Sequence, residues 1–269
     1  MFREKAVIIT GASSGLGATL ALELARDGAH LALFSPQEKE QREVVGLCEE
    51  VGGKAMAVIG DVTAPQDCKR LVDETLACYG RVNYLIANAG ISMWARFDEI
   101  EDLEVFRRLV EINYLGALNC IYHALPHLKE SRGMVAAITS IQSKIGVPQH
   151  TGYVASKHAL QGFCEALRME LEDSGVDILT VLPHWLRGTD LRKNALGKSG
   201  EALGSAAKKH SKESVSLEDA SRAIMKALHN RESQLIIPWK LKLLLLLNLL
   251  RPRWAESLIK GAMGKQKER

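Results

Sequence analysis

The stretch Ala6-Val-Ile-Ile-Thr10-Gly11-Ala-Ser-Ser-Gly15-Leu-Gly17 decides the fold of this chain. Residues 6–10 are a continuous run of apolar or β-branched side chains, which is typical of a strand buried on both faces of a parallel sheet. A glycine-rich turn follows, and residues 18–26 then have the pattern of a helix. Backbone N–H groups at such a turn, together with the helix dipole, can hold a pyrophosphate. The spacing is G-x3-G-x-G rather than the commoner G-x-G-x-x-G, so a turn without a ligand is the alternative.

Strands and helices alternate from this stretch to residue 238, at connection lengths typical of βαβ units. Pro126 is expected to break the helical stretch that contains it near its end, because proline lacks the backbone N–H. The sequence therefore predicts an α/β fold, a single-domain doubly wound parallel sheet of about seven strands flanked by helices. The expected strands are 6–10, 30–34, 54–59, 82–87, 133–139, 176–182 and 234–238, and the expected helices are 18–26, 37–51, 65–79, 102–128, 158–172 and 217–229.

Composition indicates an ordinary globular protein. The chain has 269 residues, of which 46% are hydrophobic and 25% charged, which is enough for one large core. The net charge of +3 is spread along the chain, so nucleic-acid binding is not indicated. Five cysteines without C-x-x-C or zinc spacing favour reduced, mostly buried thiols. The first residues run directly into a strand and no apolar run approaches ~20 residues, so we expect a cytoplasmic protein without a signal peptide or transmembrane helix.

Tyr153 and Lys157 lie four residues apart, where the chain enters an expected helix. Positions i and i+4 share one face of a helix, so both side chains can point into a single site. A nearby ammonium favours the phenolate, so we expect Lys157 to pull the pKa of Tyr153 from ~10 towards neutrality. Tyr153 would then both donate and accept a proton. Taken alone, a tyrosine at the edge of the core and a solvated lysine are the commoner arrangement.

Other polar residues follow the expected strands. Asp61 and Asn88 come just past the carboxyl ends of two strands, the edge where ligands bind in such sheets. Asp61 either contacts an adenine or is an ordinary turn carboxylate. His123 and His127 have the i, i+4 spacing of metal ligands, but no third ligand is evident, and we assign them to a helix surface with no metal.

Two segments depart from the alternation. Residues 187–212 are rich in Gly, Ala, Ser and Lys, and loops of this length are usually lids or disordered, so we assign a substrate lid there. Residues 239–269 form a hydrophobic and basic tail, in which Trp239 and Trp254 bracket a run of leucines with Lys and Arg at its ends. A helix that packs on the sheet or on a neighbouring subunit is one interpretation of the tail. An interfacial membrane anchor or a cover for an apolar substrate is the other.

With these motifs assembled, residues 4–238 resemble the short-chain dehydrogenase/reductase family, and within it the branch of the 11-beta-hydroxysteroid dehydrogenases. The similarity to that branch is clearest from Ser140 to Gly146 and from Tyr153 to Phe163. The family resemblance implies a Rossmann-type dehydrogenase domain over residues 1–238 and sets the tail apart. The matching motifs occur in the family's order and are Thr10-Gly11-Ala-Ser-Ser-Gly15-Leu-Gly17, Asp61-Val62, Asn88-Ala-Gly90, Asn113, Ser140 and Tyr153-x3-Lys157.

The resemblance implies reversible hydride transfer between a nicotinamide and a carbonyl or alcohol carbon. Tyr153 would exchange the proton, Lys157 would lower the pKa of Tyr153 and hold the nicotinamide ribose, Ser140 would hydrogen-bond the substrate oxygen, and Asn113 would hold a water of the proton relay. The cofactor would also contact Gly11, Ser13, Ser14, Gly15, Leu16, Gly17, Ser35, Asp61, Val62, Asn88, Ala89, Gly90, Pro183 and Thr189. The substrate would contact Ser140, Gln142, His150, Tyr153, His184 and Trp185, although a solvated loop histidine is an equal interpretation of His150.

Two local features bear on the cofactor. Residues 34–37 carry neither the acidic residue typical of NAD users nor an arginine, and Ser35 or Gln37 can donate to a 2′-phosphate, with Lys39 close by. This favours NADP(H), with NAD(H) as the alternative. The family's Pro-Gly-x3-Thr is Pro183-His-Trp-Leu-Arg-Gly-Thr189 here, so the backbone beside the nicotinamide is expected to differ.

The leading hypothesis is thus an NADP(H)-dependent oxidoreductase, a carbonyl reductase acting on a hydrophobic steroid, sphingoid or other lipid-like ketone. One alternative is a 3-oxoacyl-thioester reductase, whose basic segment 187–212 would dock an acidic carrier. The other is a catalytically silent dinucleotide-binding sensor. The resemblance also implies a homodimer or homotetramer, and the tail adds a peripheral membrane contact as an option.

Overall fold

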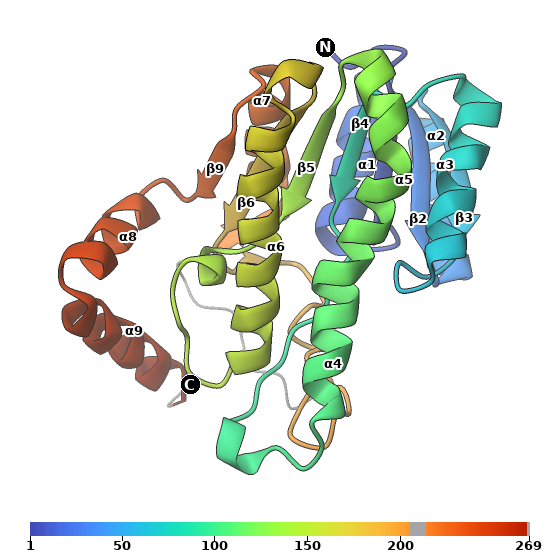
Figure 1. The fold of residues 1–269 in the computed structure, drawn as a ribbon. Coiled ribbons are helices and arrows are strands. Elements are labelled where there is room, and N and C mark those ends of the chain that lie inside the picture. Colours follow the sequence, from blue (N-terminus) through green and yellow to red (C-terminus); the bar gives the residue numbers. More distant parts are fainter. Residues whose placement is uncertain (205–213, 268–269) are drawn as a thin grey trace.

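A computed structural model describes residues 1–204 and 214–267, with side chains described as far as residue 263. Within these residues, seven parallel strands form one sheet in the order β3-β2-β1-β4-β5-β6-β9, which confirms the doubly wound α/β prediction (Figure 1). The strands of the sheet are β1 (Ala6–Thr10), β2 (His30–Ser35), β3 (Lys54–Ile59), β4 (Tyr84–Ala87), β5 (Met134–Ile138), β6 (Asp177–Pro183) and β9 (Gln234–Ile237).

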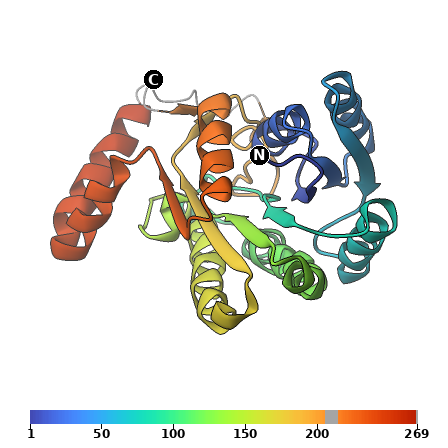
Figure 2. The same cartoon turned by 90° about the horizontal axis from the view of Figure 1, so that it is seen from above.

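Helices cover both faces of the sheet, as the view from above shows (Figure 2). Alternate residues of the strands point to opposite faces: Val7 and Ile9 pack with the helices on one face, whereas Ile8 packs with the helices on the other. The sheet therefore separates two apolar cores, as a buried parallel sheet requires. The helices are α1 (Gly15–Arg26), α2 (Glu38–Glu50), α3 (Pro65–Tyr79), α4 (Glu104–Val110), α5 (Gly116–Ser131), α6 (Thr151–Glu170), α7 (Leu217–His229), α8 (Leu241–Leu250) and α9 (Pro252–Lys267), with short helical turns η1 (Phe97–Glu99), η2 (Glu111–Leu115), η3 (Ile141–Ser143) and η4 (Glu172–Ser174).

The position of the site follows from the strand order. β1 lies between β2 and β4, so the chain winds outward in both directions from β1. The loops after β1 and β4 therefore diverge at the carboxyl edge and leave a crevice at this switch point. The parallel pairing is in register to the last residue of β1, where Thr10 lies opposite Phe34 of β2.

Two details of the helices differ from the prediction. Pro126 lies inside α5, which continues to Ser131 instead of breaking at the proline. The carbonyl that loses its helical partner belongs to Tyr122, whose side chain is 75% exposed, so this side of the helix faces solvent that can satisfy the group. In addition, α6 begins at Thr151, so Tyr153 already lies in its first turn.

The segment after β6 is partly ordered against the body of the domain. The strands β7 (Leu186–Arg187) and β8 (Val215–Ser216) pair with each other, and Leu196 bridges to Met93. The part of the expected 187–212 lid from residue 205 onward lies outside the described residues.

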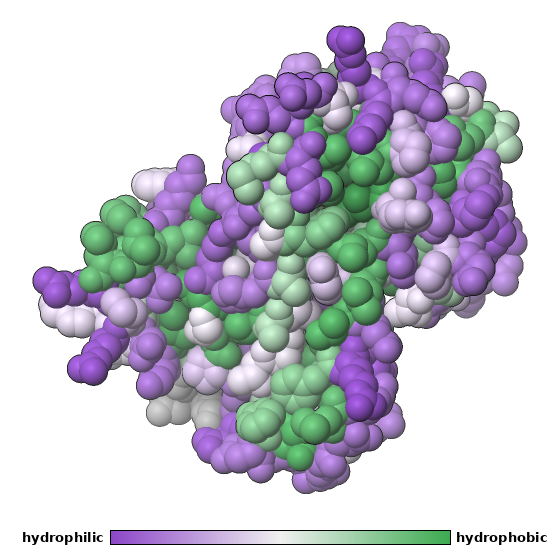
Figure 3. All heavy atoms as spheres, viewed as in Figure 1, coloured by the Kyte–Doolittle hydropathy of each residue, from purple (hydrophilic) through white to green (hydrophobic). Residues whose placement is uncertain are grey.

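The tail forms the helices α8 and α9, which extend from β9 along the edge of the molecule (Figure 1). One side packs on the domain, where Leu241, Leu245 and Ile259 contact a cluster containing Ile141 and Ile145. Apolar side chains also gather on the outer surface over α8 (Figure 3). Among the described residues, no helix combines the length and the apolar composition needed to cross a bilayer.

Candidate active site

The glycine-rich turn after β1 is shaped for a phosphate. Gly11 has φ +62° and Gly15 has φ +54°, a left-handed conformation that favours glycine. A Cβ on Gly11 would lie 2.8 Å from Ala89 Cα, and one on Gly17 would lie 2.3 Å from the Gly11 carbonyl oxygen. Ser14 precedes α1 without capping it through its side chain, so the first N–H groups of the helix face the crevice. This cradle fits the pyrophosphate of a dinucleotide.

Asn88, after β4, fixes the shape of this turn. Its side-chain Nδ2 donates to the carbonyl oxygens of Thr10 at 3.0 Å and Gly11 at 3.1 Å. The Thr10 hydroxyl in turn accepts from the backbone N–H groups of Asn88 and Ala89, both at 3.0 Å. Two loops that meet at the switch point are thus held together by side-chain hydrogen bonds, and the crevice between them is preformed.

Asn113 anchors the next segment from a π-helical turn between α4 and α5. Its Oδ1 accepts from the Ile91 N–H at 2.8 Å, and its Nδ2 donates to the Ile91 carbonyl and to the Ser156 hydroxyl, both at 2.9 Å. A Cβ on Gly90 would lie 2.9 Å from Asn113 Oδ1 and 3.4 Å from Lys157 Nζ. The Asn113 amide is fully buried and belongs to the frame of the site.

Ser140, Tyr153 and Lys157 converge on one wall of the crevice. Lys157 Nζ lies 5.9 Å from the centroid of the Tyr153 ring and donates to the Ile138 carbonyl at 2.9 Å. Ser140 follows β5 and accepts from the Gln142 N–H at 3.1 Å, which holds its hydroxyl at the start of η3. All three residues are at most 7% exposed. A substrate oxygen at this wall would meet two hydroxyl groups backed by an ammonium.

Burial controls the protonation of this wall. Burial raises the pKa of Tyr153 to about 12, and the hydrogen bond with Ser140 opposes that shift. Burial also lowers the pKa of Lys157 to about 8. The expectation that Lys157 pulls the Tyr153 pKa towards neutrality is therefore not met in this structure, because desolvation of the phenolate outweighs the neighbouring ammonium. Tyr153 is a phenol at neutral pH, the form that can give up a proton.

Aromatic rings and a guanidinium close the other end of the crevice. The Arg192 guanidinium carbon lies 3.9 Å from the ring centroid of Trp185 and 5.2 Å from that of Trp94. His150 packs on Trp94 with centroids 4.8 Å apart, and burial lowers the pKa of His150 to about 4, so the ring is neutral. Burial lowers the pKa of Arg192 to about 10, which leaves it charged at neutral pH. This end of the crevice is therefore aromatic, largely apolar and positively charged at one point.

One cavity of about 530 Å³ joins the phosphate cradle, the Ser140–Tyr153–Lys157 wall and the aromatic end. Of the residues predicted from the sequence, Gly17 and Asn113 alone are absent from its lining, and both support it from behind. Thr189 lines the cavity and faces Gly15 despite its displaced position in the motif. Asp61 lines it as well, while its Oδ1 accepts from the Thr63 N–H at 2.8 Å, so it also serves as a turn carboxylate.

Comparison with known proteins identifies the family. A model of the short chain dehydrogenase family matches residues 5–199. This chain is a short-chain dehydrogenase. Its resemblance to the hydroxysteroid dehydrogenase branch is also confirmed. The protein named 11-beta-hydroxysteroid dehydrogenase-like 4A from Arabidopsis thaliana is 40% identical over 177 residues, which are 65% of this chain and 59% of that protein.

A second relative, named 11-beta-hydroxysteroid dehydrogenase, comes from Pinus massoniana. It is 34% identical over 200 residues, which are 74% of this chain and 56% of that protein. The chain thus spans less than two thirds of the length of these curated relatives.

Solved structures show the same fold. A short chain dehydrogenase/reductase from Burkholderia phymatum in complex with NAD superposes with a TM-score of 0.81 at 21% identity, covering 92% of this chain and 93% of the other. An alcohol dehydrogenase from the archaeon Thermococcus sibiricus, complexed with 5-hydroxy-NADP, superposes with a TM-score of 0.73 at 24% identity, covering 87% and 95%.

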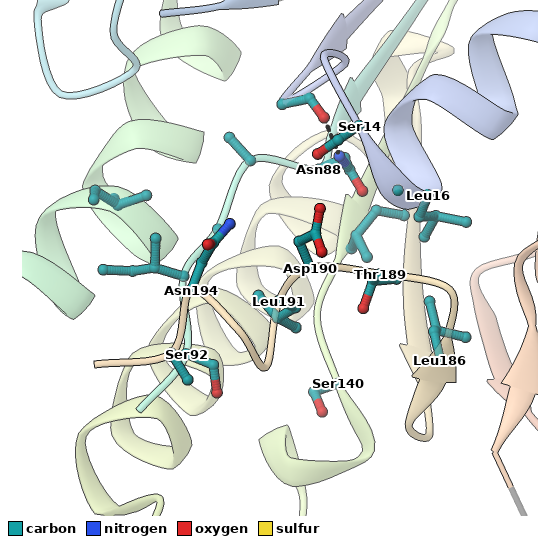
Figure 4. A pocket seen from close by; sticks show the side chains of 18 of the residues that line it. Ser14, Leu16, Asn88, Ser92, Ser140, Leu186, Thr189, Asp190, Leu191 and Asn194 are labelled. Atoms are coloured by element: carbon teal, nitrogen blue, oxygen red, sulfur yellow. Dashed lines mark hydrogen bonds between the residues drawn. The ribbon is translucent and has the colours of Figure 1, made fainter. Parts of the chain in front are cut away.

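Several residues of this short-chain dehydrogenase's cavity were missed from the sequence. They come from the segment after β6, whose side chains face Ser14, Asn88 and Ser140 across the cavity (Figure 4). The sequence showed that this segment contains basic and aromatic residues. Their contacts with Trp94 could not be predicted, because they depend on the bridge between Leu196 and Met93. Glu40, from the first turn of α2, was also missed. The missed lining residues include Glu40, Asp190, Leu191, Arg192 and Asn194.

A metal site was not predicted. Among the described residues, no three His, Cys, Asp or Glu side chains lie together as metal ligands. His127 pairs with Glu130 at 3.3 Å on the surface of α5. The five cysteines are free, and Cys78 is the exposed one.

Proposed function

We propose that this short-chain dehydrogenase reduces a hydrophobic ketone, or oxidises the matching alcohol, with NADP(H). The observation that carries the proposal is the single cavity in which the phosphate cradle leads to Ser140, Tyr153 and Lys157. A bound nicotinamide supplies the hydride when it lies in this cavity.

The protein's own residues manage the substrate oxygen and its proton. Ser140 and Tyr153 donate hydrogen bonds to the carbonyl oxygen, which polarises the carbon and stabilises the charge that develops on the oxygen. Tyr153 then transfers its proton to that oxygen, for which its raised pKa provides the correct starting form. The Lys157 ammonium, 5.9 Å from the ring centroid, stabilises the phenolate that remains. The role of Asn113 in holding a water stays a prediction, since its side-chain amide bonds to Ile91 and Ser156.

The polar groups where the adenosine end would lie support NADP(H). Gln37 Oε1 accepts from the Ser35 hydroxyl at 2.6 Å and from the Ser13 hydroxyl at 3.1 Å, so three neutral polar side chains gather there. Neutral donors can turn towards a 2′-phosphate. Glu40 also lines this part of the cavity and opposes the phosphate's charge, so NAD(H) is the competing cofactor.

The aromatic end supports an apolar, ring-containing substrate such as a steroid, a sphingoid ketone or another lipid-like ketone. Trp94 and Trp185 meet edge to face with centroids 5.7 Å apart, and large rings of this kind bury apolar surface efficiently. Leu196 N donates to the Ser92 carbonyl at 2.8 Å, and Trp94 N donates to the Leu196 carbonyl at 2.9 Å. We propose that the segment from β7 to residue 204, held in this way, is the described part of a lid over the substrate.

Assembly is also part of the proposal. The long helices α5 and α6 leave Tyr122 and Met169 exposed at 75% and 72%. Exposed apolar side chains on such helices suit a contact between copies, and we propose a homodimer or homotetramer.

The test follows oxidation of NADPH and of NADH with a panel of steroid, long-chain and small aromatic ketones and one 3-oxoacyl thioester. Tyr153→Phe is expected to lower kcat by at least about 100-fold, because the proton donor is lost while the ring remains. Tyr122→Phe is the matched control, since Tyr122 is exposed and is not among the residues that line the cavity.

The outcomes separate the competing functions. Turnover confined to the thioester would favour the thioester reductase. Cofactor binding without turnover on any ketone would favour the sensor. Failure to bind either cofactor would contradict the proposal.

A further inference from the structure

The tail carries a large apolar surface that faces outward. Its side chains lie on α8, on α9 and just before α8, and their exposed fractions run from 53% to 78%. Apolar patches of this kind mark protein or membrane contacts. We name this surface the tail face, and it consists of Trp239, Leu243, Leu246, Leu249, Leu250, Trp254 and Leu258.

The fold does not need the tail face for its own stability. The opposite side of the two helices already packs on the domain, where Leu244, Leu245 and Ile259 meet Ile145, and where Ala255 is fully buried. Packing on that side fixes the helices and leaves the tail face turned away from the core (Figure 3). The outer leucines therefore lie in water unless something else covers them.

The net positive charge of the tail indicates which kind of partner covers the tail face. Residues 239–260 contain one carboxylate, Glu256, against five basic residues, Lys240, Lys242, Arg251, Arg253 and Lys260. A symmetric contact between two copies through this face would bring both sets of basic residues together, which is unfavourable. Basic side chains at the edge of an apolar surface, with tryptophans at its ends, instead suit the boundary between anionic headgroups and acyl chains.

We propose that α8 and α9 dock this protein on the surface of an anionic lipid bilayer. The leucines of the tail face enter the acyl boundary, and the lysines and arginines contact the headgroups. The helices lie in the interface without crossing the bilayer, in keeping with their length.

The inner side of the tail helices, opposite the docked face, lies beside the substrate end of the cavity. The inner side of the tail packs on Ile141 and Ile145, which flank the cavity residue Gln142. A groove next to α9 is lined by Gln149 with Lys260 and Met263, and Gln149 Oε1 accepts from Trp94 Nε1 at 2.7 Å. A side chain that lines the groove, Gln149, thus directly contacts a side chain that lines the cavity, Trp94. The docking of the tail on a bilayer does not rest on the proposed function. The delivery of a lipid-like ketone from the bilayer to the cavity does rest on it.

The test is sedimentation of the full chain with vesicles. One set is phosphatidylcholine alone, and the other contains about one third phosphatidylglycerol. We expect binding to the anionic vesicles to be at least about tenfold tighter at low salt, and to weaken at high salt as the headgroup charge is screened. Emission from Trp239 and Trp254 should shift to shorter wavelength on binding, and this shift should be lost in Trp239→Phe/Trp254→Phe.

Matched variants localise the contact. Leu243→Ser/Leu246→Ser/Leu250→Ser is expected to weaken vesicle binding at least about tenfold, because apolar insertion is lost. Leu47→Ser/Val51→Ser/Leu103→Ser alters exposed apolar residues elsewhere and should bind as the wild type does. Circular dichroism, and turnover of a water-soluble ketone, should be unchanged in both triple variants.

Three outcomes would overturn the proposal. They are the absence of sedimentation with both vesicles at low salt, equal binding by the wild type and the tail variant, and a tail variant that changes the oligomer mass without any vesicle binding. The last would assign the tail face to a second copy. Loss of turnover with intact vesicle binding would instead count against the proposed function alone.

Discussion

Asn113 and Ile91 are joined through both ends of the Asn113 side-chain amide, with Oδ1 accepting from the Ile91 N–H at 2.8 Å and Nδ2 donating to the Ile91 carbonyl at 2.9 Å. The pair ties the π-helical turn before α5 to the segment that leaves β4. Since Gly90 directly precedes Ile91 and approaches Lys157, the pair also sets how closely the backbone after β4 approaches the Lys157 side chain.

Asn113→Ala should therefore destabilise the protein by about 2–4 kcal/mol. The substitution removes a buried amide that makes three hydrogen bonds, and it leaves the N–H and the carbonyl of Ile91 without their hydrogen-bond partner. Ser156→Ala removes one partner of that amide and should cost about 1 kcal/mol. Urea unfolding of the three proteins measures both effects. Equal stability of Asn113→Ala and the wild type would contradict the anchoring role.

Lys157→Met is expected to raise stability while it abolishes activity. Burial lowers the Lys157 pKa from 10.5 to about 8, so holding the charged form in the fold at neutral pH costs on the order of 3 kcal/mol. Loss of the bond to the Ile138 carbonyl offsets part of the gain, which leaves an expected increase of about 1–2 kcal/mol.

The pH dependence of this gain checks its cause. Because the folded-state pKa is lowered, the unfolded chain binds more protons between about pH 8 and pH 10.5, and the stability of the wild type rises through that window relative to the variant. Thermal unfolding should thus show the advantage of Lys157→Met at about pH 7 and its loss near pH 10. Lys129→Met, on the surface of α5, is the control and should show no such trend.

The reduction rate should be level through the neutral range and fall at alkaline pH. Tyr153 stays protonated to about pH 12 and His150 is neutral above about pH 4, so neither titrates between these limits. Lys157 loses its proton near pH 8 and then no longer stabilises the Tyr153 phenolate, so kcat/KM for ketone reduction should decline above that pH. A fall centred near pH 6 would instead implicate another group.

The sequence was sufficient where local pattern determines structure. The run from Ala6 to Gly17 predicted strand, turn and helix because β-branching, glycine spacing and helical periodicity act within a few residues of each other. Residues at strand ends were placed correctly because parallel strands share one carboxyl edge. Nearly the whole predicted site accordingly lines one cavity.

Effects that depend on burial or distant packing were not predictable in this way. The pKa of Tyr153 follows from complete desolvation, which the Tyr153–Lys157 spacing does not reveal. Pro126 was misjudged because its tolerance depends on which side of α5 faces solvent. Arg192 between Trp94 and Trp185 unites two segments about a hundred residues apart, and no local signal marks that contact.

Cofactor choice is tested by the charge at Glu40. This carboxylate lines the cavity near Ser35 and Gln37, so Glu40→Gln should raise kcat/KM for NADPH about three- to tenfold by removing repulsion of the 2′-phosphate, with little change for NADH. Gln37→Asp should act in the opposite direction. Glu38→Gln is the control, since Glu38 pairs with Arg42 and is absent from the cavity lining. Equal changes in kcat/KM for NADPH and NADH in Glu40→Gln would contradict a 2′-phosphate bound beside Glu40.

Gln142 is expected to select substrates that carry a hydrogen-bond donor near the reacting carbonyl. Its side chain is 3% exposed and lines the cavity, and its Oε1 has no hydrogen-bond partner among the described residues. A buried acceptor in this state costs about 1–3 kcal/mol, which a substrate hydroxyl would recover on binding. Gln142→Met keeps the length of the side chain and removes the acceptor. The variant should therefore unfold at higher temperature than the wild type in the absence of substrate.

The same variant should lose discrimination between substrates. Its kcat/KM for a hydroxy-ketone should fall about 10- to 100-fold relative to the wild type, whereas its kcat/KM for the ketone without the hydroxyl should change little. The reason is that a buried acceptor left without a hydrogen bond disfavours the ketone that lacks the hydroxyl, and Gln142→Met removes this acceptor. Measuring both ketones with both proteins gives the coupling between Oε1 and the hydroxyl directly. A variant that is less stable and loses activity equally on both ketones would show that the Gln142 side chain supports the frame of the site by its packing and does not bind the substrate hydroxyl, because the backbone N–H of residue 142 that donates to Ser140 is retained in Gln142→Met.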